Sequence, residues 1–267
     1  MGDSSDPLAS HRVTSEPFYQ PVAEECAWFA AAYAGRLPVL LKGPTGCGKT
    51  RFVEHMAWRL GRPLVTVACH DDLTAGDLTG RWLLDADGTR WQDGPLTLAA
   101  RHGAICYLDE LVEARADTTV ILHPLTDTRR ILPLEKRGEL LHAHPDFHLV
   151  VSYNPGGTAK SLKNSTRQRF CALEFTYPGP AAEAAIVVRE SACDPAFATK
   201  LVAFAGRTRL PGLGLEAGAS TRMLVHAGVL ARQGIRPKDA CRMAVVAALS
   251  DDPEIAEALA AALDAAF

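Results

Sequence analysis

A glycine-rich stretch near the start of the chain has the spacing of a phosphate-binding loop. GPTGCGKT fits the pattern G-x-x-x-x-G-K-[ST] and lies between an apolar run and a helical pattern. Its glycines allow backbone N–H groups to surround phosphate oxygens, and the following helix adds its positive amino end. Lys49 would reach the β- and γ-phosphates, and Thr50 would bind Mg²⁺. The predicted nucleotide-binding residues are Gly43, Pro44, Thr45, Gly46, Cys47, Gly48, Lys49 and Thr50.

Two adjacent carboxylates end a later apolar run, AICYLDE. Asp109 could bind Mg²⁺ directly or through water, and Glu110 could polarise an attacking water molecule. Two solvated acids at a strand end are the alternative, but the phosphate loop upstream favours a site. The pair also separates reaction classes, because a hydrolase needs a residue such as Glu110, whereas a small-molecule kinase must protect the phosphoryl group from water.

Two further polar residues could contact the phosphates. Asn154 ends the run VVSYNP, where its amide could orient water or contact the γ-phosphate. An Asn before a proline also simply makes a turn, and the spacing leaves both readings open. Arg222, in GASTRML, opens a predicted helix and could close a lid over the phosphates, coupling hydrolysis to domain motion. A surface arginine is the alternative for Arg222.

Arg167 and Arg169, in STRQRF, immediately precede a predicted strand. Nucleotides bind at the carboxyl ends of the strands in a parallel α/β sheet, so these arginines would lie away from the site of their own subunit. A γ-phosphate on a neighbouring subunit would explain them, and an arginine supplied in this way contributes about 10³–10⁵ in rate. A solvent-exposed basic edge is the alternative.

Composition narrows the class of protein. The chain has 267 residues, of which 48% are apolar and 22% charged, as in an ordinary globular protein. A formal net charge of -3 disfavours a broad nucleic-acid-binding face. No apolar run approaches the roughly 20 residues of a membrane span, and the polar amino terminus lacks a signal-peptide core, so we expect a cytoplasmic protein. Seven cysteines without a C-x-x-C pair predict reduced thiols, and a metal site at His142, His144 and His148 is a weaker possibility.

The pattern along the chain predicts an α/β domain followed by a helical one. Five nearly continuous apolar runs alternate with helical segments, which favours a parallel sheet covered on both faces: LPVLLKG, PLVTVACH, AICYLDE, FHLVVSYN and FCALEFTY. TYPGPAAE breaks the pattern, so we expect domains at 1–179 and 180–267. Ser220, Asp239 and Asp252 lie near plausible helix starts.

Two insertions interrupt the alternation and predict hairpins at about 80–92 and 130–142. Asp87-Gly88 is a strong turn signal in the first, and the second turns near Lys136. They are either surface hairpins without a special role or hairpins that contact a substrate. In the first, Trp82, Leu83 and Leu84 either contact such a substrate or pack the hairpin against its own domain.

These motifs, in this order, resemble the AAA+ ATPases, and within them the MoxR group and its CbbQ/NorQ (NirQ) branch, most closely CbbQ. The resemblance covers most of residues 16–177 and weakly the helical part. It implies a P-loop NTPase αβα sandwich with a five-stranded parallel sheet and a helical lid. Within that fold, the glycine-rich stretch matches Walker A, Asp109–Glu110 Walker B, Asn154 sensor 1 and Arg222 sensor 2. Arg169 best matches the arginine finger, with Arg167 beside it.

The resemblance also implies an assembly and partners. The first hairpin matches an insert that lines the pore of a hexamer, and the second precedes sensor 1. The loop Pro155–Lys163 is shorter than expected in the branch. Relatives use ATP and Mg²⁺, act with a von Willebrand factor A domain partner (CbbO) and remodel inhibited Rubisco by releasing sugar phosphates. NorQ-like relatives act with NorD on nitric oxide reductase.

The motifs do not separate these two clients, and we favour Rubisco activation. Two other classes of function stay open. One is a non-catalytic nucleotide switch that recruits a partner. The other is a nucleic-acid motor of the same fold, which the acidic balance of the chain disfavours.

Overall fold

A computed structural model describes residues 6–86, 88–155, 162–211, 215 and 217–267. The chain divides into two compact units, which are described separately here. The first unit contains Met1–Lys42 and Lys49–Glu174, and the second contains Gly43–Gly48 and Phe175–Phe267. The predicted domain boundary at residue 179 stays a prediction.

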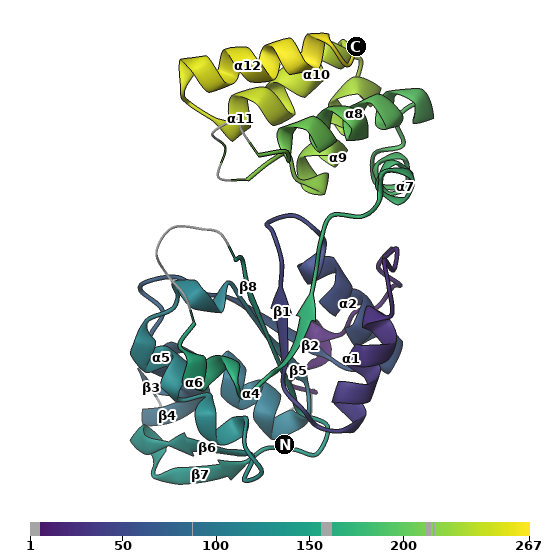
Figure 1. The fold of residues 1–267 in the computed structure, drawn as a ribbon. Helices are drawn as coiled ribbons and strands as arrows, with labels where there is room; N and C mark the ends of the chain where they lie inside the picture. Colours follow the sequence, from purple (N-terminus) through teal and green to yellow (C-terminus); the bar gives the residue numbers. More distant parts are fainter. Residues whose placement is uncertain (1–5, 87, 156–161, 212–214, 216) are drawn as a thin grey trace. The chain divides into compact units, whose positions relative to one another are not determined.

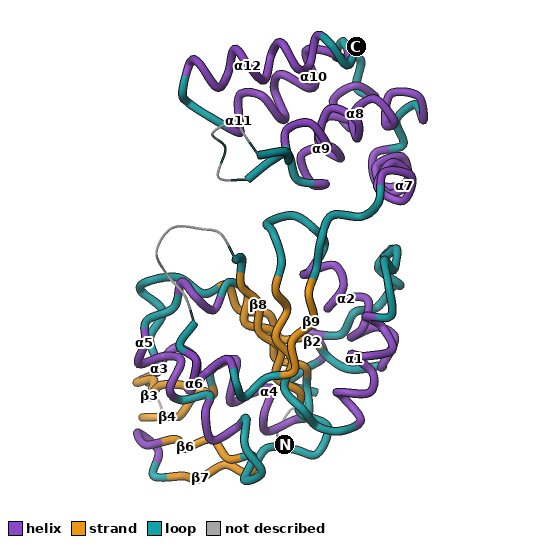
Figure 2. Tube along the Cα trace, in the orientation of Figure 1, coloured by secondary structure: helices purple, strands orange, loops and turns teal. Residues whose placement is uncertain are grey.

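A five-stranded parallel sheet forms the centre of the first unit (Figure 2). The strand order is β2-β5-β8-β1-β9, and each strand falls within one of the five predicted apolar runs. The strands are β1 (Val39–Lys42), β2 (Leu64–Ala68), β5 (Ile105–Asp109), β8 (His148–Tyr153) and β9 (Cys171–Glu174). The central strand β8 is buried at all six positions, as expected for a strand covered on both faces. The predicted fold class is confirmed.

Helices cover both faces of this sheet (Figure 1). On one side, α1 (Glu25–Ala34) and α2 (Lys49–Leu60) meet through the rings of Phe29 and Phe52, whose centroids are 5.4 Å apart. On the other side, α4 (Pro95–His102) buries Leu96, Ala99 and Ala100 against the strands. The remaining short helices of this unit are η1 (Ala9–His11), α3 (Ala75–Thr79), η2 (Leu111–Glu113), α5 (Ala116–Val120), η3 (His123–Leu125), η4 (Glu135–Arg137) and α6 (Asn164–Arg167).

Two antiparallel hairpins project from the first unit. One pairs β3 (Gly80–Asp85) with β4 (Gly88–Asp93), and the other pairs β6 (Ile131–Leu134) with β7 (Glu139–His142). Asp87, half of the predicted turn signal, lies outside the described residues, as do residues 156–161 of the loop predicted to be short.

The second unit is helical apart from its loops. Its helices are α7 (Pro180–Ser191), α8 (Pro195–Thr208), α9 (Thr221–Arg232), α10 (Pro237–Cys241), the π-helical turn η5 (Arg242–Val246), α11 (Ala247–Leu249) and α12 (Pro253–Asp264). Ser220 and Asp252 cap α9 and α12 with their side chains, as predicted. Asp239 also lies near a helix start, in the first turn of α10, and Asp194 is a cap of α8 that the sequence analysis missed.

No helix in the described ranges is long and apolar enough to cross a membrane. All seven cysteines are free thiols, and six of them are buried.

Candidate nucleotide site

Five polar residues meet at one edge of the parallel sheet, and we call them the strand-end cluster: Lys49, Thr50, Asp109, Glu110 and Asn154. They come from the start of α2, the end of β5 and the residue after β8. β1, β5 and β8 are adjacent and parallel, so their carboxyl ends lie at the same edge. The sequence therefore predicted a set of residues that the fold brings together.

A chain of hydrogen bonds connects Lys49, Asn154 and Glu110. The Lys49 ammonium donates to Asn154 Oδ1 at 2.6 Å, and Asn154 Nδ2 donates to Glu110 Oε1 at 2.8 Å. Lys49 is only 7% exposed, so its charge lies in a poorly solvated position. Asn154 thus contacts both the lysine predicted to bind phosphate and the acid predicted to activate water, which a turn residue alone would not do.

Asp109 is held by three hydroxyl groups. Tyr107 OH donates to Asp109 Oδ1 at 2.7 Å, and Ser152 Oγ donates to the same oxygen at 2.5 Å. Thr50 Oγ1 lies 3.3 Å from the other oxygen, Oδ2. Burial, and then the charge of Asp109, raise the pKa of Tyr107, which keeps the phenol protonated as a donor. Sequence analysis missed Tyr107 and Ser152, although both lie on the predicted strands.

Glu110 has a left-handed backbone, with φ 56° and ψ 48°. This region is uncommon for residues other than glycine and costs free energy that the surrounding contacts must offset. Its N–H donates to Ser152 Oγ at 3.0 Å, and its carboxylate accepts from Asn154. Ser152 therefore holds the backbone of Glu110, and Asn154, two residues further along the chain, holds its side chain.

The cluster fits a magnesium ion by its chemistry. Asp109 and Thr50 offer carboxylate and hydroxyl oxygens, which are the donors that Mg²⁺ prefers. Mg²⁺ usually binds through one or two protein ligands together with substrate phosphates. Within the described ranges, no group of three or more His, Cys, Asp and Glu residues is arranged to hold a metal.

Two of the three histidines weighed as a metal site, His142 and His148, have different surroundings. His148 is 1% exposed and packs against the rings of Phe29 and Tyr33, with centroids 5.2 and 5.3 Å away. Burial, followed by the charge of Arg130, lowers the pKa of His148 to about 3, so this imidazole is neutral at pH 7. His142 is exposed at the end of β7.

The predicted phosphate loop, Gly43–Gly48, is part of the second unit. Gly46 has φ 69°, and a Cβ there would lie 2.6 Å from Ser220 Cβ, so both backbone and space require glycine. That Cβ would also lie 3.5 Å from Arg222 Cβ, which brings the start of α9 close to the loop. Tyr177 OH donates to Thr45 O at 3.1 Å and steadies the loop from the same unit. Within this unit, the predicted lid arginine therefore lies beside the phosphate loop.

Arg167 and Arg169 lie at the opposite end of the sheet from the strand-end cluster. Arg167 ends α6, Arg169 follows it, and both precede β9. The first residue of β9, Cys171, pairs with Val39, the first residue of β1. Since the site is at the other end of β1, a strand of four residues, about 10 Å of strand separates the arginines from it.

The two arginines differ in exposure. Arg167 is exposed and donates to Asn164 Oδ1 on its own helix. Arg169 is partly buried, and its Nη1 donates to the carbonyl of His123 at 3.3 Å. Burial and the charges of Arg169 and Lys163 lower the pKa of His123. In this structure, Arg167 is the more accessible of the two.

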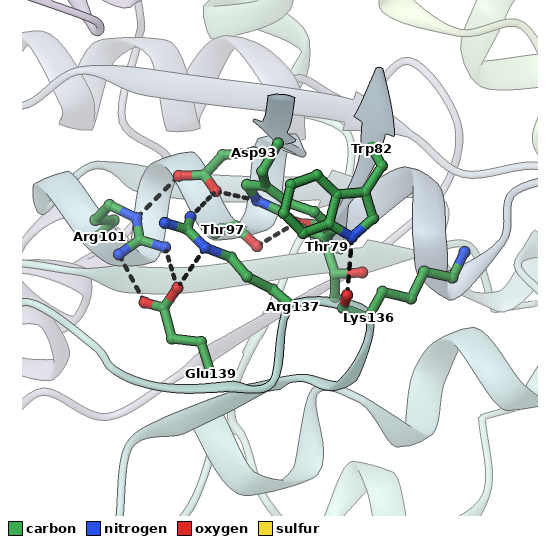
Figure 3. Close-up of polar contacts among 9 residues, drawn as sticks. Thr79, Trp82, Asp93, Thr97, Arg101, Lys136, Arg137 and Glu139 are labelled. Atoms are coloured by element: carbon green, nitrogen blue, oxygen red, sulfur yellow. Dashed lines mark hydrogen bonds and ion pairs between the residues drawn. The ribbon is translucent and has the colours of Figure 1, made fainter. Parts of the chain in front are cut away.

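The two hairpins are joined by an ion network that we call the hairpin junction: Asp93, Arg101, Arg137 and Glu139 (Figure 3). Arg101, on α4, donates to Asp93 at 2.9 Å and to both oxygens of Glu139 at 2.8 and 3.2 Å. Arg137 lies 3.0 Å from Glu139 and 3.6 Å from Asp93. The base of the first hairpin is therefore tied to the second.

Tryptophans extend this connection. Trp82 Nε1 donates to the carbonyl of Lys136 in the second hairpin at 2.9 Å, as Figure 3 shows. Trp82 also meets its cross-strand partner Trp91 edge to face, with centroids 5.4 Å apart. Trp82 is still 49% exposed, and Leu84, two residues further on the same face, is 84% exposed. Trp82 therefore packs the hairpin against its own unit while about half of its surface stays exposed, and Leu84 faces solvent; contact of this hairpin with a substrate stays a prediction.

The fold and the strand-end cluster define the class of this protein as an AAA+ type P-loop NTPase with a helical C-terminal part. The family model "AAA domain (dynein-related subfamily)" matches residues 38–170, and "CbbQ/NirQ/NorQ C-terminal" matches residues 183–266. The chain belongs to the CbbQ/NirQ/NorQ family.

Curated relatives agree with this family over most of the chain. Protein CbbQ from Hydrogenophilus thermoluteolus is 61% identical, covering 96% of this chain and 97% of the relative. Protein NorQ from Paracoccus denitrificans is 59% identical, covering 91% of each chain. The denitrification regulatory protein NirQ from Pseudomonas aeruginosa is 57% identical, covering 91% of this chain and 95% of the relative.

Two solved structures share the fold at low sequence identity. A putative ATPase from Cytophaga hutchinsonii has a TM-score of 0.51 at 15% identity, covering 90% of this chain and 80% of that one. A proline-to-glycine mutant of Thermotoga maritima RuvB has a TM-score of 0.52 at 17% identity, covering 90% and 69%. These similarities support the fold alone.

Proposed function

We propose that this protein is an ATP-hydrolysing AAA+ remodelling motor. The observation that carries the proposal is the hydrogen-bonded chain from Lys49 through Asn154 to Glu110, beside the Thr50–Asp109 pair. A site that only bound nucleotide would need the lysine and the hydroxyl. It would not need a carboxylate held in a strained backbone and oriented by an amide, as Glu110 is.

Each residue has a role that follows from its chemistry. Lys49 would neutralise charge on the β- and γ-phosphates, and Asn154 orients the carboxylate of Glu110. Glu110 would accept a hydrogen bond from the attacking water and so increase its nucleophilicity. Thr50 and Asp109 would hold Mg²⁺, which neutralises negative charge on the phosphates when it is bound.

Completion of the site requires a second copy of the chain in this proposal. Arg167 and Arg169 lie at the far end of their own sheet, so they would serve a neighbouring subunit in a hexamer. Arg169, which best matches the arginine finger, would have to leave the carbonyl of His123, whereas Arg167 is already exposed. Arg222 would sense the phosphates from the second unit.

We further propose that the motor acts with a von Willebrand factor A domain partner resembling CbbO and releases sugar phosphates from inhibited Rubisco. The family and the CbbQ relative support this client. A NorQ- or NirQ-like role in the maturation or activation of nitric oxide reductase is the second candidate. It is supported by relatives of nearly equal identity, one of which is named for denitrification.

Glu110→Gln tests the catalytic proposal. The variant should bind ATP with wild-type affinity and lose turnover, because the amide cannot act as a base. Glu54→Gln is a matched control, since Glu54 is a partly exposed glutamate of α2 that pairs with Arg51 at 3.4 Å. Unchanged hydrolysis in Glu110→Gln would refute the site. Absence of turnover in the wild-type protein, with and without its partner, would favour a non-catalytic nucleotide switch.

Mixed rings test the contribution of the neighbouring subunit. In this proposal, rings made only of Arg169→Ala or of Arg167→Ala subunits hydrolyse ATP slowly or not at all. Mixing either variant with Glu110→Gln subunits should restore turnover, because the Glu110→Gln subunit still supplies its arginine to the intact site of its neighbour. Rescue at no mixing ratio, in rings shown to contain both subunits, would contradict an arginine supplied in trans. Arg129→Ala is the control, because Arg129 is exposed and pairs with Asp127 at 2.6 Å.

The client is tested by reconstitution. The protein and its von Willebrand partner should restore activity to Rubisco inhibited by a bound sugar phosphate, in a reaction that requires ATP hydrolysis. Activation of nitric oxide reductase instead, with no effect on Rubisco, would select the second candidate.

A further inference from the structure

Ser152 lies between the two carboxylates of the strand-end cluster. It is the fifth residue of β8, and the register pairs its neighbour Val151 with Leu108, so Ser152 faces the end of β5. Its side chain is completely buried. One hydroxyl makes two contacts there: it donates to Asp109 Oδ1 at 2.5 Å and accepts from the N–H of Glu110 at 3.0 Å.

The first contact determines how the carboxylate of Asp109 is turned. Oδ1 receives the hydroxyls of Ser152 and Tyr107, and Oδ2 is left on the side of Thr50, 3.3 Å from its Oγ1. A carboxylate held by two donors on one oxygen cannot rotate freely. Asp109 Oδ2 is therefore held beside Thr50 Oγ1, so that an ion bound by the hydroxyl could also bind this oxygen.

The second contact fixes the backbone of Glu110. A left-handed conformation at a residue other than glycine is strained and persists only where neighbouring groups hold it. Glu110 has φ 56°, and its N–H bonds to Ser152 Oγ while its carboxylate bonds to Asn154 Nδ2. Ser152 and Asn154, two residues apart, thus hold the same glutamate at two points.

We propose that Ser152 is a positioning residue of the ATPase site, which orients the metal-binding oxygen of Asp109 and the backbone of Glu110 at once. The inference rests on the proposed function, because it assigns Ser152 a role in that same site. A residue at this position must be small, because the site is fully buried, and must donate and accept a hydrogen bond together. Alanine would remove both contacts, whereas threonine would keep both.

Ser152→Ala is the primary test, and Ser191→Ala is its matched control. Ser191, on α7 of the second unit, is also a buried serine that donates one hydrogen bond, to Val187 O at 2.7 Å, and accepts one, from Cys193 N at 3.3 Å. The two variants therefore remove similar hydrogen bonds, but only one removes them from the strand-end cluster. Ser152→Thr tests rescue, and Ser152→Cys, which is nearly isosteric and a weaker donor, replaces it if threonine does not fit.

Ser152→Ala should lower kcat by about 10- to 100-fold, the range for residues that orient metal ligands. It should also raise the Mg²⁺ concentration for half-maximal turnover, while KM for ATP measured at saturating Mg²⁺ changes little. In a direct binding assay with a fluorescent ATP analogue, the affinity gained on adding Mg²⁺ should shrink, whereas the affinity in EDTA should stay within twofold. Threonine should restore these values, and cysteine should restore them in part.

Two results would overturn the inference. One is wild-type kcat and Mg²⁺ dependence in folded Ser152→Ala protein. The other is a loss matched by Ser191→Ala, or by the fraction unfolded in circular dichroism, since a merely structural hydroxyl would behave in this way. If the wild-type protein itself does not hydrolyse ATP, the proposed function fails, and the binding assay alone decides whether Ser152 organises the Mg²⁺ side of the site.

Discussion

The strand-end cluster and the hairpin junction are two polar networks of the first unit that differ in charge balance. At the junction, two guanidinium groups face two carboxylates, and the four charges pair with one another. In the cluster, the carboxylates of Asp109 and Glu110 accept hydrogen bonds from hydroxyl groups and an amide. Neutral donors orient a carboxylate without cancelling its charge.

The difference in charge balance indicates a difference in purpose. The junction is complete in itself, so its contribution is to hold α4 and the two hairpins together. The cluster keeps its negative charge at a strand edge and holds Glu110 in a strained backbone, which suits a site that a cation and a substrate complete. Changes in the cluster should therefore affect nucleotide chemistry first, and changes at the junction should affect stability first.

The largest effect is expected from Lys49→Ala in the cluster. Removal of the charge that would meet the phosphates should cost about 2–5 kcal/mol of ATP binding, or roughly 30- to 4,000-fold in affinity. Lys42→Ala is the control, because Lys42 ends β1 and pairs with exposed Glu174 at 2.8 Å. Equilibrium binding of a fluorescent ATP analogue measures both. Equal affinities for the wild-type protein and Lys49→Ala would contradict a phosphate role for the lysine.

Asn154→Ala should act on turnover more than on binding. It removes the amide that orients Glu110, and loss of one such oriented group costs about 10- to 100-fold in kcat. Asn154→Asp retains an acceptor for Lys49 but places a second negative charge beside Glu110, so it should not rescue the rate. Steady-state ATPase assays give kcat and KM separately. Full activity in Asn154→Asp would show that the contact with Glu110 is dispensable.

The residues of the cluster could be predicted from sequence because their positions follow from local pattern and sheet topology. Asp109 and Asn154 each follow a buried apolar run, and parallel strands bring such ends to one edge. Ser152 and Tyr107 were missed for a physical reason. Both lie inside those runs, where a single polar residue in a buried strand has the appearance of core. Tyr107 lies two residues before Asp109 on the same strand, and only the register between β5 and β8 shows that Ser152 faces Asp109.

The hairpin junction was predicted only in outline. The turn signals gave both hairpins, but neither the charges nor their spacing indicated that Arg101 joins Asp93 to Glu139. Arg101 is separated from Glu139 by 38 residues, and its partners are fixed by packing of α4 rather than by local sequence. Ion pairs between residues this far apart in the chain leave no recognisable pattern in the local sequence.

Arg101→Ala should destabilise the first unit while leaving the chemistry intact. It removes the closer of the two guanidinium groups that Asp93 and Glu139 share and leaves them only the longer contacts of Arg137. We expect a loss of about 1–2 kcal/mol in the free energy of unfolding, since the groups are partly exposed. Arg137→Ala should cost less, because its contacts are longer. Urea denaturation measures stability, and basal ATPase per folded molecule should stay within about twofold. Lost turnover in fully folded Arg101→Ala protein would show that the junction also shapes the site.

The smallest effect is a change in the pH dependence of stability in Glu139→Gln. The hydrogen bond from Arg101 lowers the pKa of Glu139 in the folded protein, helped by the charges of Arg101 and Arg137. The unfolded state therefore binds the proton first, so the stabilisation is present above the ordinary glutamate pKa of about 4.3 and is lost as pH falls through the folded value. Urea unfolding between pH 7 and 3 should show the wild-type protein losing up to about 1 kcal/mol more than Glu139→Gln.

The control for this prediction is Glu174→Gln. Lys42 lowers the pKa of Glu174 in the same direction, but the side chain is 72% exposed, so solvent screens the pair and the slope should change less. A constant offset between the wild-type protein and Glu139→Gln at every pH would mean that the substitution acts through packing rather than charge. Since the junction is distinguished from the strand-end cluster by its paired charges, that result would remove the basis of the distinction.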